Sequence, residues 1–142
     1  MVVKYHAAES SQERGIWELI DGQQRVTTIF IILKYLTNSN SYSINYKTRQ
    51  SSAEFLDIHL LDSLNFKEWS DFIKSEGNHK YNNVDNYHFY RAIHCVARWF
   101  EEKSSDEKEK WKSKLLENTK IIWYAAPEAE QSIDNKASID IF

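Results

Sequence analysis

The sequence is poor in residues that cross-link or break a chain, since its 142 residues include one cysteine, one proline and three glycines. The lone cysteine, Cys95, excludes an internal disulfide and a cysteine-based zinc cluster, which is typical of a reducing, cytoplasmic setting. We expect Cys95 to be a small buried residue, because a catalytic thiol needs a neighbouring base. No apolar run approaches the roughly 18 residues of a membrane-spanning helix, so we expect no membrane contact.

A net excess of basic charge is also missing, since the formal net charge is −3 and the pI is about 6.0. A domain that binds nucleic acid over a broad face usually has a pI above about 9, so direct DNA binding by this chain alone is disfavoured. What the sequence does have is 42% hydrophobic residues, with 14% aromatic residues, which is enough for a packed core. The length indicates a single domain spanning residues 1–142.

The first part of the chain, residues 1–37, predicts a β-hairpin, a turn and a helix. The runs Val2–His6 and Ile16–Ile20 are β-prone and are separated by a polar stretch closed by Gly15, which predicts an antiparallel hairpin. Gly22 ends the second strand. From Val26 to Thr37 apolar residues recur every three or four positions, which predicts a buried helix.

The remainder, residues 42–142, predicts a mainly helical body. Alternating side chains over 42–46 indicate a strand, and a helix is expected from Ser51 or Ser52 with Glu54 capping its first turn. A short amphipathic helix over 65–77 and a long helix from Asn83 or Asp85 follow.

The charge-dense run 101–118 is expected to form two helical segments broken at Ser104–Ser105, with Trp111, Leu115 and Leu116 facing inward. A strand near 119–125 and the start of a further helix over 132–142 complete an α+β fold.

The stretch Asp21–Arg25, with the sequence DGQQR, lies at the predicted strand-to-helix turn. A helix N-terminus offers unpaired backbone N–H groups and a partial positive charge to an anion. Arg25 can place two donors on a phosphate, and its position is mildly unfavourable for the helix unless an anion is bound. Asp21 can hold a metal-bound water or orient Arg25.

The neighbouring polar residues can add further contacts to such a site. Gln23 and Gln24 supply amide groups, and Thr27 and Thr28 supply hydroxyls. The alternative is that Asp21 only caps the helix while Arg25 is a solvated surface residue. The spacing alone leaves both interpretations open.

Two other groups of polar residues are candidates for a site. Tyr46, Thr48 and Arg49 precede a helix start and form either a second phosphate or partner contact or a simple helix cap. His88 and His94 are six residues apart on a helix and point in different directions, so we expect no metal site.

The segment LIDGQQRVTTIFIIL, Leu19–Leu33, resembles the prokaryotic DGQQR-motif family that includes the N-terminal domain of GmrSD-type modification-dependent restriction enzymes. The resemblance continues in INYKTRQSSAEFL, in NVDNYHFYRAIHCVARWF and in the closing KIIWYAA and IDIF. It therefore covers nearly the whole chain.

The resemblance implies a ParB/sulfiredoxin-like core that binds and hydrolyses a nucleoside triphosphate with Mg²⁺. It implies that Asp21, Gly22, Gln23, Gln24 and Arg25 form the nucleotide-site motif, followed by Thr27 and Thr28. DNA is expected as a partner through the full-length protein, which is expected to be an NTP-dependent DNA endonuclease or NTPase.

The sequence departs from the family pattern at both ends. A preceding proline/glutamine–arginine motif and a following arginine–leucine–asparagine motif are missing, and no His-Asn-His nuclease constellation can be assembled. We therefore expect a fragment, inactive alone, with the nuclease domain or subunit elsewhere. The alternative function is a non-catalytic helical interaction module in which the DGQQR turn is structural.

Overall fold

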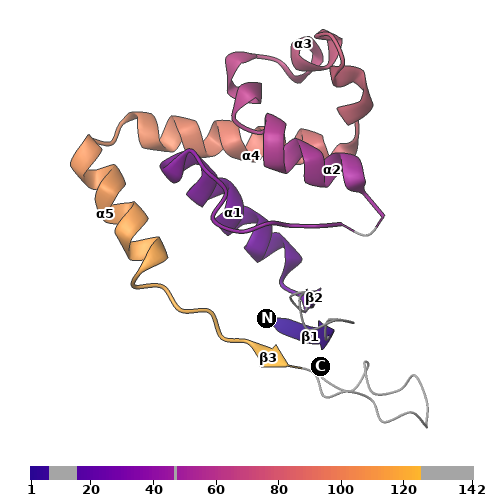
Figure 1. Cartoon of the computed structure of the whole chain (residues 1–142). Helices are drawn as coiled ribbons and strands as arrows, with labels where there is room; N and C mark the ends of the chain where they lie inside the picture. The colour runs from indigo at the N-terminus through magenta and orange to yellow at the C-terminus, as the bar shows by residue number, and fades with distance from the viewer. Residues whose placement is uncertain (7–15, 47, 126–142) are drawn as a thin grey trace, which may run out of the picture. The chain divides into compact units, whose positions relative to one another are not determined.

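The computed structural model describes residues 1–6, 16–46 and 48–125, which form a mixed α+β structure (Figure 1). The predicted fold class, a small β element with a predominantly helical body, is confirmed. The chain divides into two compact units, one made of Met1–Gln23 with Ile121–Phe142 and one of Gln24–Lys120. The predicted loop closed by Gly15 and the helix predicted over 132–142 lie outside the described residues.

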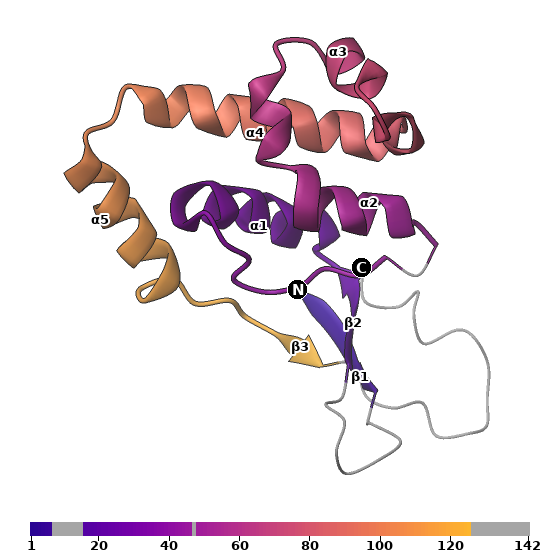
Figure 2. The same ribbon diagram turned by 45° about the horizontal axis from the view of Figure 1, so that its top comes forward.

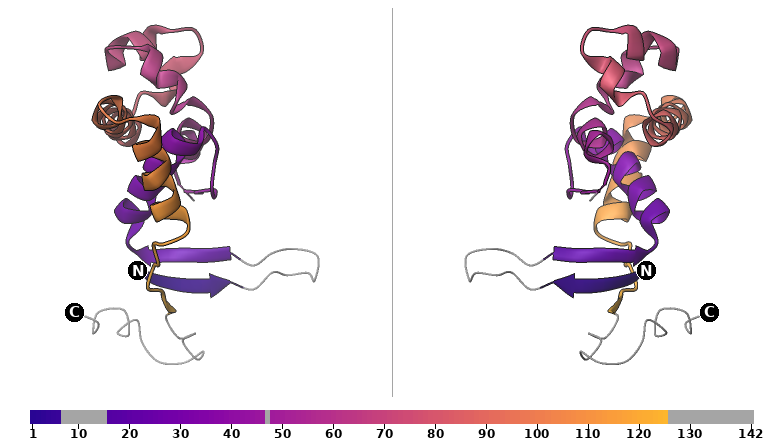
Figure 3. Two further views of the ribbon diagram at one scale, coloured as in Figure 1. Left: turned by 90° about the vertical axis from the view of Figure 1, so that its left-hand side faces the viewer. Right: turned by 90° about the vertical axis from the view of Figure 1, so that its right-hand side faces the viewer.

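The first unit contains a three-stranded sheet with the order β2-β1-β3. Strands β1 (Val2–His6) and β2 (Ile16–Asp21) pair antiparallel, as the sequence predicts, and Figure 3 shows their arrows running in opposite directions. Strand β3 (Tyr124–Ala125) pairs parallel to β1. Of the strand predicted near 119–125, the described residues show strand conformation at Tyr124 and Ala125, which pair with Val2 and Val3.

The second unit is helical and begins within α1 (Gln23–Thr37). After α1 come the short helix α2 (Gln50–Glu54) and the π-helix η1 (Phe55–His59). The 3₁₀ turn η2 (Asp62–Asn65), helix α3 (Trp69–Lys74) and the 3₁₀ turn η3 (Asn78–Tyr81) follow. The unit ends with the two longer helices α4 (Val84–Glu101) and α5 (Ser105–Leu116). The core of this unit consists of apolar and aromatic side chains from α1 to α4, and they are Phe30, Ile31, Phe55, Leu56, Leu60, Phe72, Tyr81, Tyr90 and Ile93.

Helix α1 begins three residues earlier than the apolar pattern predicts, at Gln23 instead of Val26. Its first turn is polar, so the hydrophobic periodicity does not reveal it. The helix ends at Thr37 as predicted, and Asn38 follows with a φ of 53°. Asparagine tolerates this left-handed conformation better than most residues and so ends the helix.

A buried lysine ties α1 to the π-helix. Lys34 is 5% exposed, and its Nζ donates to Leu56 O and Asn40 Oδ1, both at 2.8 Å, and also to Asp57 O. Burial lowers the pKa of Lys34, while the nearby Asp57 acts against this shift. The buried ammonium thus finds acceptors on two carbonyl groups of the π-helix, which joins α1 to η1.

Two predictions for residues 42–54 are wrong. Residues 42–46 form no strand, although Tyr42, Ile44 and Tyr46 do alternate inward and pack against the core. The segment lies between α1 and α2 in the chain, and the described strands β1, β2 and β3 pair with one another and not with it. Helix α2 begins at Gln50, next to the predicted start near Ser51 or Ser52, but the capping role predicted for Glu54 is wrong, because α2 has no side-chain cap and Glu54 pairs with Lys80 at 3.0 Å.

Helices α4 and α5 begin where the sequence predicts. Asn83 caps α4 by accepting from Asn86 N at 2.9 Å, and α5 starts after the predicted break at Ser104–Ser105. Figure 2 shows α5 leaving α4 at a sharp corner.

The inward-facing prediction for α5 is wrong, because this helix buries no residue and Trp111 and Leu116 are 40% and 48% exposed. Leu115 is only partly buried. The prediction that Cys95 is buried is also wrong. Cys95 lies two residues from Ile93 on α4, which places it on the side of the helix opposite the buried stripe.

Candidate functional site

The DGQQR motif forms a tight strand-to-helix turn. Strand β2 ends at Asp21, Gly22 has a φ of 97°, and α1 begins at Gln23. Glycine adopts this positive φ without the strain that a Cβ would add. The residue directly before the helix is therefore Gly22, which has no capping side chain, and Asp21 is the last residue of β2.

A β-bulge determines which way Asp21 faces. Val3 pairs with Leu19 and Val2 pairs with Asp21, so Ile20 is an extra residue in β2. Paired residues share a face of the sheet, and the bulge therefore moves Asp21 from the face of Leu19 to the opposite face. Bulges beside functional sites commonly redirect a side chain in this way.

The face that receives Asp21 is polar. Lys4 and Glu18 pair on it, and His6 Nε2 lies 2.7 Å from Glu18 Oε2. The other face carries aromatic side chains, with the ring centroids of Tyr5 and Trp17 4.8 Å apart. The hairpin thus separates an aromatic face from the polar face that carries the motif aspartate.

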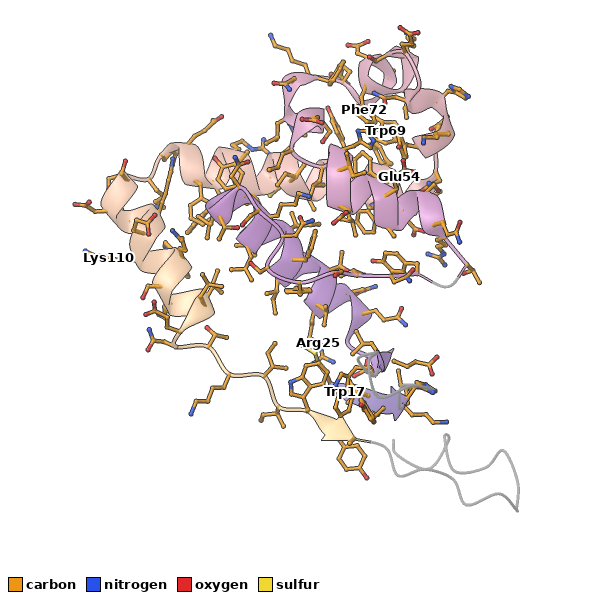
Figure 4. The ribbon with its side chains drawn as sticks, in the orientation of Figure 1. Trp17, Arg25, Glu54, Trp69, Phe72 and Lys110 are labelled. Carbon is orange, nitrogen blue, oxygen red and sulfur yellow. The ribbon has the colours of Figure 1, made fainter. Side chains whose placement is uncertain are left out.

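The first turn of α1 combines an exposed arginine with the absence of acidic residues. Figure 4 shows Arg25 projecting from the start of this helix. Asp21, Gln23 and Gln24 are exposed as well, and the Gln23 Nε2 donates to Leu19 O at 3.2 Å. Asp21 and Arg25 both have interaction partners within the protein. A ligand at this turn would therefore join existing contacts.

The two threonine hydroxyls of the motif are engaged within the second unit. Thr27 is 8% exposed, and its Oγ1 lies 3.0 Å from Tyr46 Oη. Thr28 Oγ1 donates to Gln24 O at 2.8 Å, one helical turn earlier. Thr28 is exposed, whereas Thr27 faces the interior.

Sequence reasoning missed the residues that hold the start of α1. Tyr42 donates its hydroxyl to Val26 O at 2.6 Å, and Tyr46 contacts Thr27. The alternation over 42–46 indicates which side chains point inward, but it does not indicate that their hydroxyls meet α1.

The second polar cluster is organised by an ion pair. Arg49 Nη1 lies 2.6 Å from Asp85 Oδ2, which links the start of α2 to the first turn of α4. Ser52 is almost fully buried. The Arg49 side chain is 59% exposed, so the ion pair lies at the surface.

The histidines serve local packing. His59 Nε2 lies 2.8 Å from Tyr81 Oη, and His94 Nε2 lies 3.3 Å from Ser63 O. Within residues 1–6, 16–46 and 48–125, no three histidine, cysteine, aspartate or glutamate side chains gather in a way that could hold a metal ion.

These features define a class of protein, a mixed α+β domain with a glycine-containing strand-to-helix turn and a basic first helical turn. Residues 1–142 match the family described as GmrSD restriction endonuclease, N-terminal domain, and the chain belongs to this family. The resemblance seen in the sequence is thereby confirmed. No curated protein and no solved structure matched the chain.

In the part of the chain that the structure describes, no helix has both the length and the apolar character of a bilayer-crossing segment.

Proposed function

We propose that the turn Asp21–Arg25 binds the phosphates of a nucleoside triphosphate with Mg²⁺, and that the domain is the nucleotide-binding NTPase part of a restriction endonuclease. One observation carries this proposal, namely that the 15-residue helix α1 begins after a glycine with a positive φ and has an arginine and no acid in its first turn. A helix of this length has a full N-terminal dipole to offer an anion.

Each residue of the turn has a role that fits its position. Gly22 allows the backbone to approach the phosphates closely, and the amides that follow it donate to phosphate oxygens. Arg25 neutralises phosphate charge with a planar pair of donors. Gln23 and Gln24 add amide contacts, and Thr28 is the exposed hydroxyl of the pair that follows.

Asp21 fits the Mg²⁺ that accompanies a triphosphate. Magnesium in such sites takes one or two carboxylates, with phosphate oxygens and waters completing its coordination. Because of the bulge in β2, Asp21 lies on the opposite face of the sheet from Leu19, next to the turn. The metal would supply charge neutralisation, and Asp21 would hold its water shell beside the phosphates.

In this proposal, the full-length protein acts in the cytoplasm as an anti-phage restriction system, and its target is foreign DNA. The chain has a net charge of −3, so DNA contact is assigned to other parts of the full protein, and cleavage to a nuclease domain or subunit outside this chain. The turn supplies electrostatic positioning, which accounts for most of the catalysis in phosphoryl transfer.

The test is the affinity of the whole chain for ATP and GTP with Mg²⁺, measured by isothermal titration calorimetry and by the rise in melting temperature. We expect binding by the wild type and a loss of about ten- to a hundredfold in Arg25→Ala, because charge-assisted hydrogen bonds are removed. Arg98→Ala is the matched control, since Arg98 is an exposed arginine on α4. Equal binding by wild type and Arg25→Ala would refute the assignment.

A second candidate function is a non-catalytic interaction module. It is favoured by the corner between α4 and α5, where Trp99 and Trp111 are 47% and 40% exposed with ring centroids 5.4 Å apart. Lys110 points away from α5 in Figure 4. If no triphosphate binds and Trp111→Ala abolishes association with the nuclease part, this second function is correct.

A further inference from the structure

Two tyrosines from the segment after α1 bind the start of that same helix. Tyr42 donates its hydroxyl to Val26 O at 2.6 Å, and Tyr46 Oη lies 3.0 Å from Thr27 Oγ1. Val26 and Thr27 directly follow Arg25 in the sequence. Both hydroxyl contacts therefore act on the residues next to the motif arginine.

The rings of the two tyrosines are anchored in the core of the second unit. The Tyr42 ring meets the Phe30 ring edge-on at 5.3 Å between centroids, and Tyr46 stacks on Phe89 of α4 at 6.4 Å. Both tyrosines pack against the buried cluster. A hydroxyl on a ring that is held in this way has little freedom, so each hydrogen bond fixes the position of its partner on α1.

Both hydroxyls keep their protons under ordinary conditions. Burial raises the pKa of Tyr42 to about 12, and burial also raises the pKa of Tyr46 above its usual value. The donation from Tyr42 to the Val26 carbonyl therefore persists across the neutral and mildly alkaline range.

We infer that Tyr42 and Tyr46 are positioning residues of the nucleotide site, and that Thr27 serves this site through Tyr46 instead of touching the ligand. This inference rests on the proposed function. A forked arginine contact requires the guanidinium to be held within a few tenths of an ångström of its productive position, and such precision comes from the groups behind the ligand-contacting residues. The tyrosine hydroxyls supply this support at the two residues after Arg25.

The first test measures the affinity for ATP·Mg²⁺ or GTP·Mg²⁺ of the whole chain by calorimetry in Tyr46→Phe, Thr27→Val and the double variant. Each single variant is expected to bind two- to tenfold more weakly, the effect of one net hydrogen bond. The double variant is expected to be no weaker than the weaker single variant, because both remove the same bond. Unchanged affinity in Tyr46→Phe, or losses that multiply in the double variant, would overturn the inference.

A matched control separates positioning from general stability. Tyr90 is a buried tyrosine of the same unit whose hydroxyl donates to Phe66 O at 3.0 Å. Tyr90→Phe removes a comparable bond far from the motif in the sequence, so its affinity for the triphosphate is expected to match that of the wild type. If Tyr90→Phe weakens binding as much as Tyr46→Phe, the effect is general and the inference fails.

The second test needs no nucleotide. Amide hydrogen exchange over residues 24–30 is expected to be several-fold faster in Tyr42→Phe and Tyr46→Phe than in Tyr90→Phe, because the helix start loses its support. Equal exchange in all three variants would overturn the inference.

The outcomes also separate this inference from the proposed function. If wild type binds, Arg25→Ala does not, and Tyr46→Phe binds like wild type, the nucleotide site stands and the positioning role is wrong. If wild type binds no triphosphate, both are wrong, whatever the exchange rates show about the helix.

Discussion

Helices α5 and α1 begin in opposite ways. At the start of α5, Ser104 Oγ accepts from Glu107 N at 3.3 Å while Glu107 Oε2 accepts from Ser104 N at 2.9 Å, which is a complete capping box. Asp106 and Glu107 also place two carboxylates in the first turn. The protein's own side chains thus satisfy the amides and the dipole of this helix.

The start of α1 has a different composition. Gly22 precedes the helix, its first turn contains no acid, and Arg25 adds a positive charge where the dipole is already positive. The first turn of α5 therefore complements the helix dipole, whereas the first turn of α1 opposes it. Such departures concentrate at functional sites, and under the proposed function a bound anion would join the contacts that Arg25 already makes within the protein.

The largest effect on triphosphate affinity is expected when the first turn of α1 is given an acidic residue, as the first turn of α5 has. Arg25→Glu should weaken binding of a triphosphate with Mg²⁺ by on the order of a hundredfold or more, because charge-assisted bonds are lost and a like charge is added. The helix dipole by itself favours an acid at this position by about 0.3–1 kcal/mol, and the loss of the contact that Arg25 makes within the protein acts against this gain. Calorimetric titration and thermal unfolding measure the two effects.

The control for this reversal is Arg98→Glu, which changes the net charge of the chain by the same amount. Triphosphate affinity should be retained in this variant. If both reversals reduce affinity equally, the long-range charge of the domain is responsible, and the start of α1 is not special.

The next largest effect is expected at the glycine that takes the place of a capping residue. Gly22→Ala should lower the free energy of unfolding by about 1–2 kcal/mol, because a Cβ is strained at a φ of 97°. Gly22→Asn should cost less, since asparagine tolerates positive φ better. Urea denaturation of both variants measures this order, and an Ala variant as stable as wild type would show that the turn does not need glycine.

A smaller effect is expected from removing the cap of α5. Ser104→Ala should cost about 1 kcal/mol of stability, the typical value of an N-cap. Triphosphate affinity should not change, because the capping box serves only the helix. Ser105→Ala, at the first position of the same helix, is the control and should stay within about 0.5 kcal/mol of wild type. A Ser104 variant no less stable than this control would mean that the box adds nothing.

Sequence reasoning succeeded where the signal is local. The paired strands β1 and β2, the starts of α4 and α5 and the DGQQR turn follow from residues that are close in the chain, such as Asn83 before α4 and Gly22 after β2. A capping residue or a glycine acts on its immediate neighbours, so its effect can be predicted without knowledge of the fold.

The rest depends on partners that are distant in the sequence. The orientation of Asp21 depends on the bulge in the pairing of β2 with β1. The Thr27 hydroxyl forms a hydrogen bond with Tyr46, which lies 19 residues later in the chain. The apolar pattern of α1 does not indicate that Lys34 is buried. Its burial depends on a carbonyl of the π-helix that accepts a hydrogen bond from its ammonium group. The exposure of Trp111 likewise depends on where the chain turns after α4, which the pattern of a single helix cannot reveal.

The smallest effect concerns pH and the capping box of α5. The backbone and hydroxyl of Ser104 donate to the Glu107 carboxylate and hold its pKa below the usual value. A carboxyl group with a lowered folded-state pKa contributes stability above its unfolded pKa, and this contribution is lost as the pH falls through the folded pKa. The melting temperature of wild type should therefore exceed that of Glu107→Gln at neutral pH, and the difference should shrink in the acid range below the usual pKa of glutamate. Glu109→Gln, on the same helix but outside the capping box, is the control. If the difference in melting temperature between wild type and Glu107→Gln is the same at all pH values, the charge of Glu107 does not contribute to the stability of this helix start.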